Sequence, residues 1–339
     1  MTTEQDPGSN ATFTRRGIAS LIVAGASALS LPAAAAGAAG SRSVRMLPAG
    51  VALQVRYRTR QVDGLNIFYR EAGPPGAPVI LLLHGFPTSS HMFRDIIPRL
   101  SGRYRVIAPD YPGYGFSDAP PADKFRYSFD RLASVMDAFV RSLGITRFVL
   151  YAQDFGGPVG FRMAAMHPER ITGLVIQNAV AHEEGLSAAL KEARPFWERR
   201  TPETEAPMRA FLKPETTRYQ YLAGARDPSA ISPDAWLHAQ ALLDRPGSAE
   251  IQLSLLHDYG SNLRRYPEWQ AYFRRHRPPM LVAWGKNDPF FTVAGAEAYR
   301  RDNPAAEVHL LDGGHFALEE FAPEISALML SFVDRITGR

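Results

Sequence analysis

Ala152-Gln153-Asp154-Phe155-Gly156-Gly157 stands between a run that predicts a strand, 148–153, and a run that predicts a helix, 156–167. The hexapeptide places Asp154 between small residues two positions before it and two positions after it. A nucleophile on a sharp strand-to-helix turn needs small neighbours there, because the chain folds back on itself. The alternative interpretation is that Asp154 only caps the helix, which is a common role for Asp.

Strand and helix patterns alternate on both sides of this turn. Strands are predicted at 65–71, 78–83, 105–108, 148–153, 173–177, 280–284 and 307–311, and helices at 90–100, 129–143, 156–167, 294–301 and 323–336. Such alternation is typical of a mostly parallel sheet with helices on both faces. The sequence therefore predicts an α/β fold.

The strand pattern stops between Asn178 and Pro278 and resumes at Met280. The intervening segment has helical spacing and is rich in Arg, Glu, Trp, Tyr and Pro. We therefore predict a core formed by residues 50–178 and 279–337, with a helical cap inserted at 179–278.

The N-terminal 40 residues have the features of an export signal. Thr14-Arg15-Arg16-Gly17-Ile18 precedes a short apolar stretch, 18–31, and a run of small residues follows at 33–40. This arrangement resembles a twin-arginine signal, so we expect export to the periplasm or the medium. The apolar stretch is too short and too rich in Gly, Ala and Ser for a typical spanning helix, and no stable membrane insertion is expected after removal of the signal.

The composition excludes several kinds of partner and site. The 339 residues carry a formal charge of only +4, with 45% hydrophobic and 21% charged residues, and no basic run lies beside aromatics as in a nucleic-acid groove. There is no Cys, so disulfides and thiolate chemistry are excluded. The sequence has no spaced metal-ligand motif and no phosphate-binding glycine loop, and we predict neither a metal nor a cofactor.

Two further residues fit the chemistry of a nucleophile at position 154. Asp288 stands in the loop after the predicted strand 280–284, and His315 follows the last predicted strand. Side chains at the carboxyl ends of parallel strands meet at one edge of a sheet, so these residues can come together despite their separation in the sequence. Taken alone, Asp288 is equally consistent with a residue that only forms a turn, and His315 with a residue that only begins a helix. Their order, nucleophile then acid then histidine, instead predicts a catalytic triad.

Residues from about 60 to 337 resemble the α/β-hydrolase superfamily, in particular its aspartate-nucleophile branch of epoxide hydrolases and haloalkane dehalogenases. Besides the turn at Asp154, the similarity rests on His84-Gly85-Phe86-Pro87 and on the loop 109–118. The resemblance implies an oxyanion hole formed by the backbone N–H groups of Phe86 and Phe155. It also implies that His84 orients the loop rather than acting as a base.

The resemblance and the residue types imply hydrolysis in two steps. An ionised Asp154 carboxylate, with a normal pKa of about 4, attacks an sp³ carbon of a small molecule and forms an ester. Water then cleaves this ester, with His315 as general base and Asp288 as its acid partner. Epoxides and alkyl halides are the electrophiles that suit an aspartate nucleophile.

The leaving group separates these two activities. Haloalkane dehalogenases usually have Trp after the nucleophile and often Asn in the oxyanion loop, whereas Phe155 and Phe86 occupy these positions and carry no ring N–H. We therefore predict an epoxide hydrolase first. In that group cap tyrosines protonate the epoxide oxygen, and the candidates are Tyr259, Tyr219 and Tyr221.

Two alternatives stay open. Trp197 and Trp236 can supply indole N–H groups to a halide, which keeps haloalkane dehalogenase as the runner-up. A binding protein without catalysis on the same fold is the third hypothesis. The sequence makes no prediction of the oligomeric state.

Overall fold

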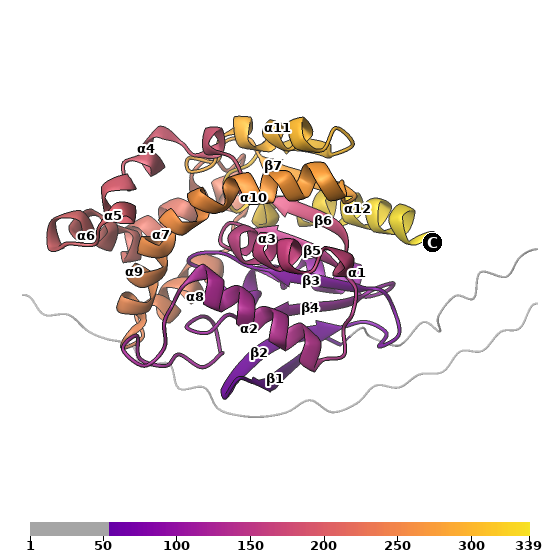
Figure 1. Cartoon of the computed structure of the whole chain (residues 1–339), viewed down its shortest axis with the longest axis horizontal. Coiled ribbons are helices and arrows are strands. Elements are labelled where there is room, and N and C mark those ends of the chain that lie inside the picture. The colour runs from indigo at the N-terminus through magenta and orange to yellow at the C-terminus, as the bar shows by residue number, and fades with distance from the viewer. Residues whose placement is uncertain (1–53) are drawn as a thin grey trace, which may run out of the picture. The chain divides into compact units, whose positions relative to one another are not determined.

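The computed structural model describes residues 54–339, and its centre is an eight-stranded sheet (Figure 1). The strands are β1 (Arg56–Val62), β2 (Leu65–Ala72), β3 (Val79–Leu83), β4 (Arg105–Pro109), β5 (Phe148–Gln153), β6 (Ile171–Gln177), β7 (Met280–Gly285) and β8 (Glu307–Leu311). Their order is β1-β2-β4-β3-β5-β6-β7-β8, and β2 is antiparallel to β1 and β4 while all other pairs are parallel. The predicted, mostly parallel α/β sheet is confirmed.

The burial of each strand explains whether the sequence pattern predicted it. Every residue of β5 and β7 is buried, and β3 is buried except at its first residue, so these strands are continuous apolar runs. The edge strand β1 exposes all of its residues except Val62. Its sequence is rich in Arg and has no apolar face, and the sequence pattern therefore did not predict it.

Helices cover both faces of the sheet. One face packs on α2 (Phe129–Ser142), α3 (Gly156–Met166) and α11 (Val293–Asp302), and the other on α1 (Ile96–Leu100) and α12 (Ala317–Thr337). The helix predicted at 90–100 is instead a 3₁₀ turn, η1 (Ser90–Phe93), followed by α1. The start of α2 is fixed by Ser128, whose side chain accepts a hydrogen bond from the backbone N–H of Arg131.

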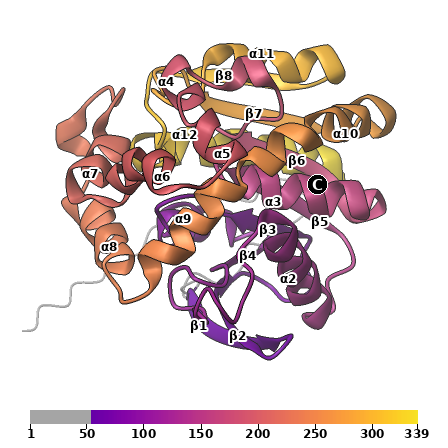
Figure 2. The ribbon, with the colours of Figure 1, turned by 60° about the vertical axis from the view of Figure 1, so that its left-hand side comes forward.

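The segment between β6 and β7 consists of helices, most of which gather at one end of the sheet, while the last one runs back over α3 (Figures 1 and 2). They are α4 (Ala188–Lys191), α5 (Arg194–Glu198), α6 (Pro202–Met208), α7 (Pro214–Leu222), α8 (Pro233–Leu243), α9 (Ser248–Asp258) and α10 (Gly260–His276), with 3₁₀ turns η3 (Glu183–Gly185), η4 (Arg209–Leu212) and η5 (Pro228–Ala230). A further turn, η2 (Pro168–Arg170), joins α3 to β6. We call α4 to α10 the cap. Because α10 packs on α3 and α11, the cap continues into the core, and the boundaries 179–278 stay a prediction.

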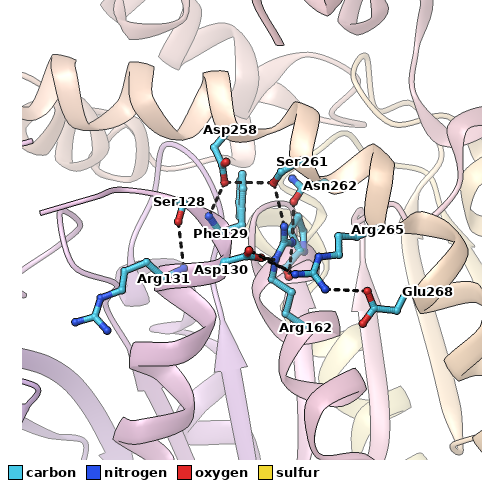
Figure 3. Close-up of polar contacts among 11 residues, drawn as sticks. Ser128, Phe129, Asp130, Arg131, Arg162, Asp258, Ser261, Asn262, Arg265 and Glu268 are labelled. Atoms are coloured by element: carbon cyan, nitrogen blue, oxygen red, sulfur yellow. Dashed lines mark hydrogen bonds and ion pairs between the residues drawn. The ribbon is translucent and has the colours of Figure 1, made fainter. Parts of the chain in front are cut away.

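Arg162 of α3 connects the core to the cap (Figure 3). The guanidinium is almost fully buried and donates hydrogen bonds to Asp130 at 2.6 Å, to Asn262 at 2.8 Å and to Ser261 at 3.0 Å. Asp130 belongs to α2, whereas Asn262 and Ser261 belong to α10. A buried Arg is tolerated only when it is paired, so this network fixes the start of α10 against both core helices.

Asp258, at the end of α9, makes the second connection in the same place (Figure 3). Its carboxylate accepts a hydrogen bond of 2.7 Å from the backbone N–H of Phe129, the first residue of α2. Ser261 donates to the same carboxylate at 3.3 Å. The residue between α9 and α10 is Tyr259, and its position is therefore set by the core.

The predicted signal region, residues 1–40, lies outside the described residues, and its role in export stays a prediction. Among residues 54–339, no helix combines the length and the apolar character needed to cross a bilayer.

Candidate active site

Asp154 occupies the sharp turn between β5 and α3. Its φ angle of 48° lies in the left-handed region, which costs about 1–2 kcal/mol for a residue with a side chain. Glycines make room for the turn: a Cβ on Gly156 would overlap the carbonyl oxygen of Leu83, and one on Gly85 would overlap the Asp154 carboxylate. The strained position is maintained by close packing, as is common at functional sites.

Two backbone N–H groups hold the Asp154 carboxylate. The N–H of Phe86 donates to Oδ1 at 2.7 Å, and the N–H of Phe155 is a second donor to the carboxylate. The helix α3 has Phe155 as its N-cap residue, without a side-chain capping bond. Asp154 is therefore not a capping residue, and the structure brings both predicted oxyanion-hole residues to it.

His315 faces Asp154 from the loop after β8. Its Nε2 lies 4.0 Å from Oδ2 of Asp154, which is too far for a direct hydrogen bond but close enough for one water molecule to contact both groups. The Nδ1 atom lies 2.7 Å from Oδ2 of Asp288. All three predicted triad residues therefore converge, each at least nine-tenths buried.

Asp288 is held by groups on both of its oxygens. The backbone N–H groups of Phe290 and Phe291 donate to Oδ1 at 2.8 and 3.1 Å. The amide of Asn178, at the end of β6, donates to Oδ2 at 2.8 Å. Asp288 therefore stabilises its own turn and also orients His315, so its two interpretations from the sequence are compatible.

The pKa values of Asp154 and His315 both differ from those of the free side chains. Burial raises the pKa of Asp154 to about 6, although His315 and the donors Phe86 and Phe155 act in the opposite direction. Burial also disfavours the imidazolium form of His315, but the carboxylates of Asp288 and Asp154 outweigh it and raise the pKa of His315 above its ordinary value. The expectation of an ordinary carboxyl pKa for Asp154 is therefore wrong, because the carboxyl group is buried.

A cavity of about 50 Å³ lies beside Asp154. It is lined mainly by apolar side chains from both core and cap: Phe86, Phe155, Leu190, Ala193, Trp197, Met208, Phe211, Leu256, Phe290 and Phe291. The polar lining comes from Asp154, His315, Gln220 and Tyr259. Apolar walls with a few polar groups are typical of a site for a small organic molecule.

Of the three candidate tyrosines, the structure brings Tyr259 to the cavity. Its ring lies 6.0 Å from that of Phe155 and 5.1 Å from that of Trp197. Tyr219 is 53% exposed, and Tyr221 is buried against Phe316 with ring centroids 3.9 Å apart. Neither side chain lines the cavity. The structure therefore does not support Tyr219 and Tyr221 as proton donors to a substrate.

The helical rotation of α7 explains this correction and identifies a residue that the sequence did not suggest. Successive residues of a helix point about 100° apart, so Gln220 faces the cavity while Tyr219 and Tyr221 point away from it. Gln220 is 3% exposed, and its Nε2 has no hydrogen-bond partner among the described residues. Its neighbours in the sequence gave no signal for this role.

The structure also separates the two candidate tryptophans. Trp197 of α5 lines the cavity beside Tyr259, whereas Trp236 of α8 is half-buried and packs elsewhere. His84 is fully buried below the site, and burial lowers its pKa to about 3. It is therefore neutral and does not line the cavity.

An outer hollow of about 320 Å³ adjoins the cavity. It is bounded by α4, α5 and α6, and three of its lining residues also line the cavity: Ala193, Met208 and Phe211. These side chains form the wall between the two spaces. Among residues 54–339 no cluster of His, Asp and Glu has the arrangement of a metal site.

The chain is similar to known hydrolases along most of its length. Residues 78–322 match the family described as alpha/beta hydrolase fold. An uncharacterized hydrolase of Saccharomyces cerevisiae is 43% identical over 284 residues, which cover 81% of this chain and 96% of the yeast protein. A haloalkane dehalogenase of Bradyrhizobium diazoefficiens is 38% identical over 128 residues, 38% of this chain and 40% of that enzyme.

Solved structures show the same relationship. A haloalkane dehalogenase from Bradyrhizobium elkani superposes with a TM-score of 0.73 at 26% identity, over 84% of this chain and 99% of that chain. The family match extends over most of the described residues, and the site built on β5, β7 and β8 lies within it. The chain belongs to the α/β-hydrolase fold family.

Proposed function

We propose that this hydrolase cleaves a carbon–halogen bond in a small haloalkane through an ester on Asp154, with epoxide opening as the second candidate. One observation carries the ester mechanism. In a largely apolar cavity, Oδ1 of Asp154 accepts a hydrogen bond from the backbone N–H of Phe86, while Oδ2 lies 4.0 Å from Nε2 of His315. A carboxylate so placed needs no base to act as a nucleophile once it is ionised.

In the first step, Oδ2 of Asp154 attacks an sp³ carbon; a C–O bond forms, and the halide leaves with the bonding electron pair. In the second step, His315 takes a proton from water, and the hydroxide attacks Cγ of Asp154. The negative charge then develops on Oδ1, to which the N–H of Phe86 already donates, and the N–H of Phe155 is a second donor to the same carboxyl group. Collapse of this intermediate frees the alcohol, which takes the proton from His315. The new Asp154 carboxyl then releases the second hydrogen of the water as a proton, which regenerates the nucleophile and gives alcohol, halide and H⁺ in total.

Support for a halide comes from the relatives and from the cap. The two haloalkane dehalogenases named above share part of the sequence or the fold with this chain. The rings of Phe86 and Phe155 offer no donor, but the cavity is also lined by Trp197 and Tyr259, two side chains that carry an N–H and an O–H donor. Neutral N–H and O–H donors suit a departing anion.

Tyr259 is the specific observation that favours an epoxide. Its side chain lines the same cavity as Asp154. Burial, then the neighbouring Tyr266 and the charge of Asp154, hold the pKa of Tyr259 well above its ordinary value. The phenol therefore stays protonated and can donate to the oxygen of an opening epoxide ring.

The decisive experiment offers the purified protein a panel of small haloalkanes and small epoxides, with halide and diol measured separately. Halide release supports dehalogenation, whereas diol formation without halide release establishes the second candidate. An absence of both products from every compound would contradict the ester mechanism. The Asp154→Ala variant shows how much of either product arises without the nucleophile.

Substitutions in the cap are expected to separate the two leaving groups. Trp197→Phe should lower kcat/KM for halide release, and Tyr259→Phe should lower it for epoxide opening, each by about 10- to 100-fold for one lost hydrogen bond to a charged group. Trp236→Phe and Tyr221→Phe, outside the cavity, are the matched controls. Equal losses in cavity and control variants would show that the cavity donors do not contact the leaving group.

Acidic pH is expected to make the wild-type protein accumulate its ester. As pH falls, His315 is protonated first because its pKa is raised, while Asp154 keeps a large ionised fraction down to its pKa of about 6. The first step then outpaces the second. The mass of the intact, acid-quenched protein should show more adduct at about pH 6 than at about pH 9. An adduct fraction independent of pH would contradict this order of titration.

A further inference from the structure

Gln220 of α7 carries a buried hydrogen-bond donor that the rest of the described chain does not use. Its side chain is almost fully buried and lines the cavity beside Asp154, but its Nε2 has no hydrogen-bond partner among residues 54–339. A buried amide donor that stays unpaired costs about 1–3 kcal/mol. A molecule in the cavity removes this cost when it brings an acceptor atom to Nε2.

A second glutamine shows how an amide is used when it holds cap helices together. Gln240 of α8 is also buried, and its Oε1 accepts a hydrogen bond of 2.6 Å from the hydroxyl of Thr217 on α7. Its Nε2 donates to the carbonyl of Leu212 at 3.1 Å and to Asp244 at 2.7 Å. These bonds fix α7 against α8 without the amide N–H of Gln220, so this N–H is available for another partner.

The helix that carries Gln220 packs on the loop of the general base. The ring of Tyr221, the next residue, stacks on the ring of Phe316 with centroids 3.9 Å apart and an interplanar angle of 2°. Phe316 directly follows His315 in the sequence, and the two rings lie 5.1 Å apart. Gln220 therefore reaches the cavity from the part of the cap that adjoins His315.

The two candidate donors to a leaving group come from a different part of the cap. Tyr259 lies between α9 and α10, with its ring 6.0 Å from that of Phe155, the residue after the nucleophile. Its ring is also 5.1 Å from that of Trp197 on α5. Because Gln220 belongs to neither of these helices nor to this aromatic group, we expect its amide to contact a part of the substrate other than the leaving group.

The charges around the cavity define the kind of acceptor that fits. Among the described residues that line it there is no Lys or Arg, and Asp154 supplies a carboxylate. An anionic substrate would lie beside that carboxylate without a compensating Lys or Arg, at a large cost in free energy. The amide N–H of Gln220 is a neutral donor, and an uncharged oxygen atom is a suitable acceptor for it.

We propose that Gln220 determines specificity by donating a hydrogen bond to an uncharged oxygen of the substrate. The preferred substrates are then small electrophiles that carry an ether, carbonyl or hydroxyl oxygen in addition to the leaving group. A pure hydrocarbon halide or epoxide leaves the donor unpaired and binds less tightly. The inference rests on the proposed function for the electrophile, but it does not depend on which of the two leaving groups is cleaved.

Binding of the oxygen is tested first, with two compounds that have no leaving group. Tetrahydrofuran and cyclopentane are rings of the same size that differ by one oxygen atom in place of a CH₂ group. In NMR spectra of the ¹⁵N-labelled full chain, tetrahydrofuran should move the side-chain amide protons of Gln220 downfield, whereas cyclopentane should not. The Gln220→Met variant identifies these signals by their absence. Equal shifts with both compounds, or no shift with tetrahydrofuran, would overturn the proposal.

Selectivity is then measured with substrates that differ by the same exchange of atoms. Bromoethyl methyl ether is compared with butyl bromide, and glycidyl methyl ether with propyloxirane. In Gln220→Met the ratio of kcat/KM for the ether to kcat/KM for its hydrocarbon partner should fall by about 10-fold, the loss expected for one neutral hydrogen bond. The loss should lie mainly in KM, because the bond is present in both the ground state and the transition state.

A contact with the leaving group would give a different result. It would lower kcat for both members of each pair and leave the ratio unchanged, which would contradict the assigned role. The intrinsic reactivities of ether and hydrocarbon cancel, because the ratio of the variant is compared with that of the wild type. Gln220→Met should fold with undiminished stability, since Nε2 has no partner to lose among the described residues.

Gln252→Met is the matched control. Gln252 lies on α9 of the cap, is almost fully buried and has an Oε1 without a partner among the described residues, but it does not line the cavity. Its replacement should leave the selectivity ratio at the wild-type value. An equal fall of the ratio in both variants would show that loss of a buried cap amide, rather than a contact with the substrate, sets the preference.

The two experiments also separate this proposal from the proposed function. A downfield shift specific to tetrahydrofuran, without turnover of any halide or epoxide, would refute the function and leave the oxygen-binding role of Gln220 in place. Turnover that depends on Asp154, with the same selectivity ratio in wild type and Gln220→Met, would support the function and refute the role of Gln220.

Discussion

With glutamine in place of His315, the protein is expected to form the ester on Asp154 and to release it very slowly. The nucleophile is intact in this variant, but the water has lost its general base, which typically contributes about 10²- to 10⁴-fold. Incubation with a substrate should therefore increase the mass of the protein by that of the alkyl group. Peptide mapping should place the increase on Asp154.

His182→Gln is the control for this result. His182 is a fully buried histidine that pairs with Asp302 at 2.6 Å, as His315 pairs with Asp288, but it does not line the cavity. Its replacement should leave turnover intact and form no adduct. If His315→Gln releases product at the wild-type rate, another group activates the water, and the two-step mechanism assigned to His315 is wrong.

Asp154→Ala is expected to abolish both steps. Removal of a nucleophile from a comparable triad lowers kcat on the order of 10⁶-fold, and no ester can form in its absence. The measurement is kcat/KM for the best compound of the panel, together with the mass of the protein after incubation. Neither product nor adduct should appear.

The matched control replaces a carboxylate that is equally buried but remote from the cavity. Asp137 of α2 is 8% exposed, as Asp154 is, and pairs with Arg141 and Arg170. Asp137→Ala should lower the free energy of unfolding and leave kcat/KM near the wild-type value. Residual turnover by Asp154→Ala above that of the solvent would mean that the chemistry lies elsewhere.

The sequence predicted the core of the site because the relevant residues follow strand ends. Asp154, Asp288 and His315 each come after a predicted strand, and the edge of a parallel sheet brings such positions together. The small residues around Asp154 indicated the tight turn in the same way. These are local signals, and they do not depend on how distant helices pack.

The cap could not be predicted in this way. Tyr259, Tyr219 and Tyr221 are equivalent as residue types, and only the rotation of α7 and the connection of Asp258 to α2 decide which of them reaches the cavity. Gln220 carried no signal at all. The raised pKa of Asp154 also depends on burial of its carboxyl group, which is a property of the tertiary packing.

The side chains that the outer hollow and the cavity share would select by size among compounds that enter from the hollow. A molecule that reaches Asp154 from the outer hollow must pass Met208 and Phe211, and Met is among the most flexible apolar side chains. Two compounds of equal reactivity then differ in kcat/KM when one is wider than this passage. Substitutions at Met208 alter the range of compounds admitted while the reacting groups stay unchanged.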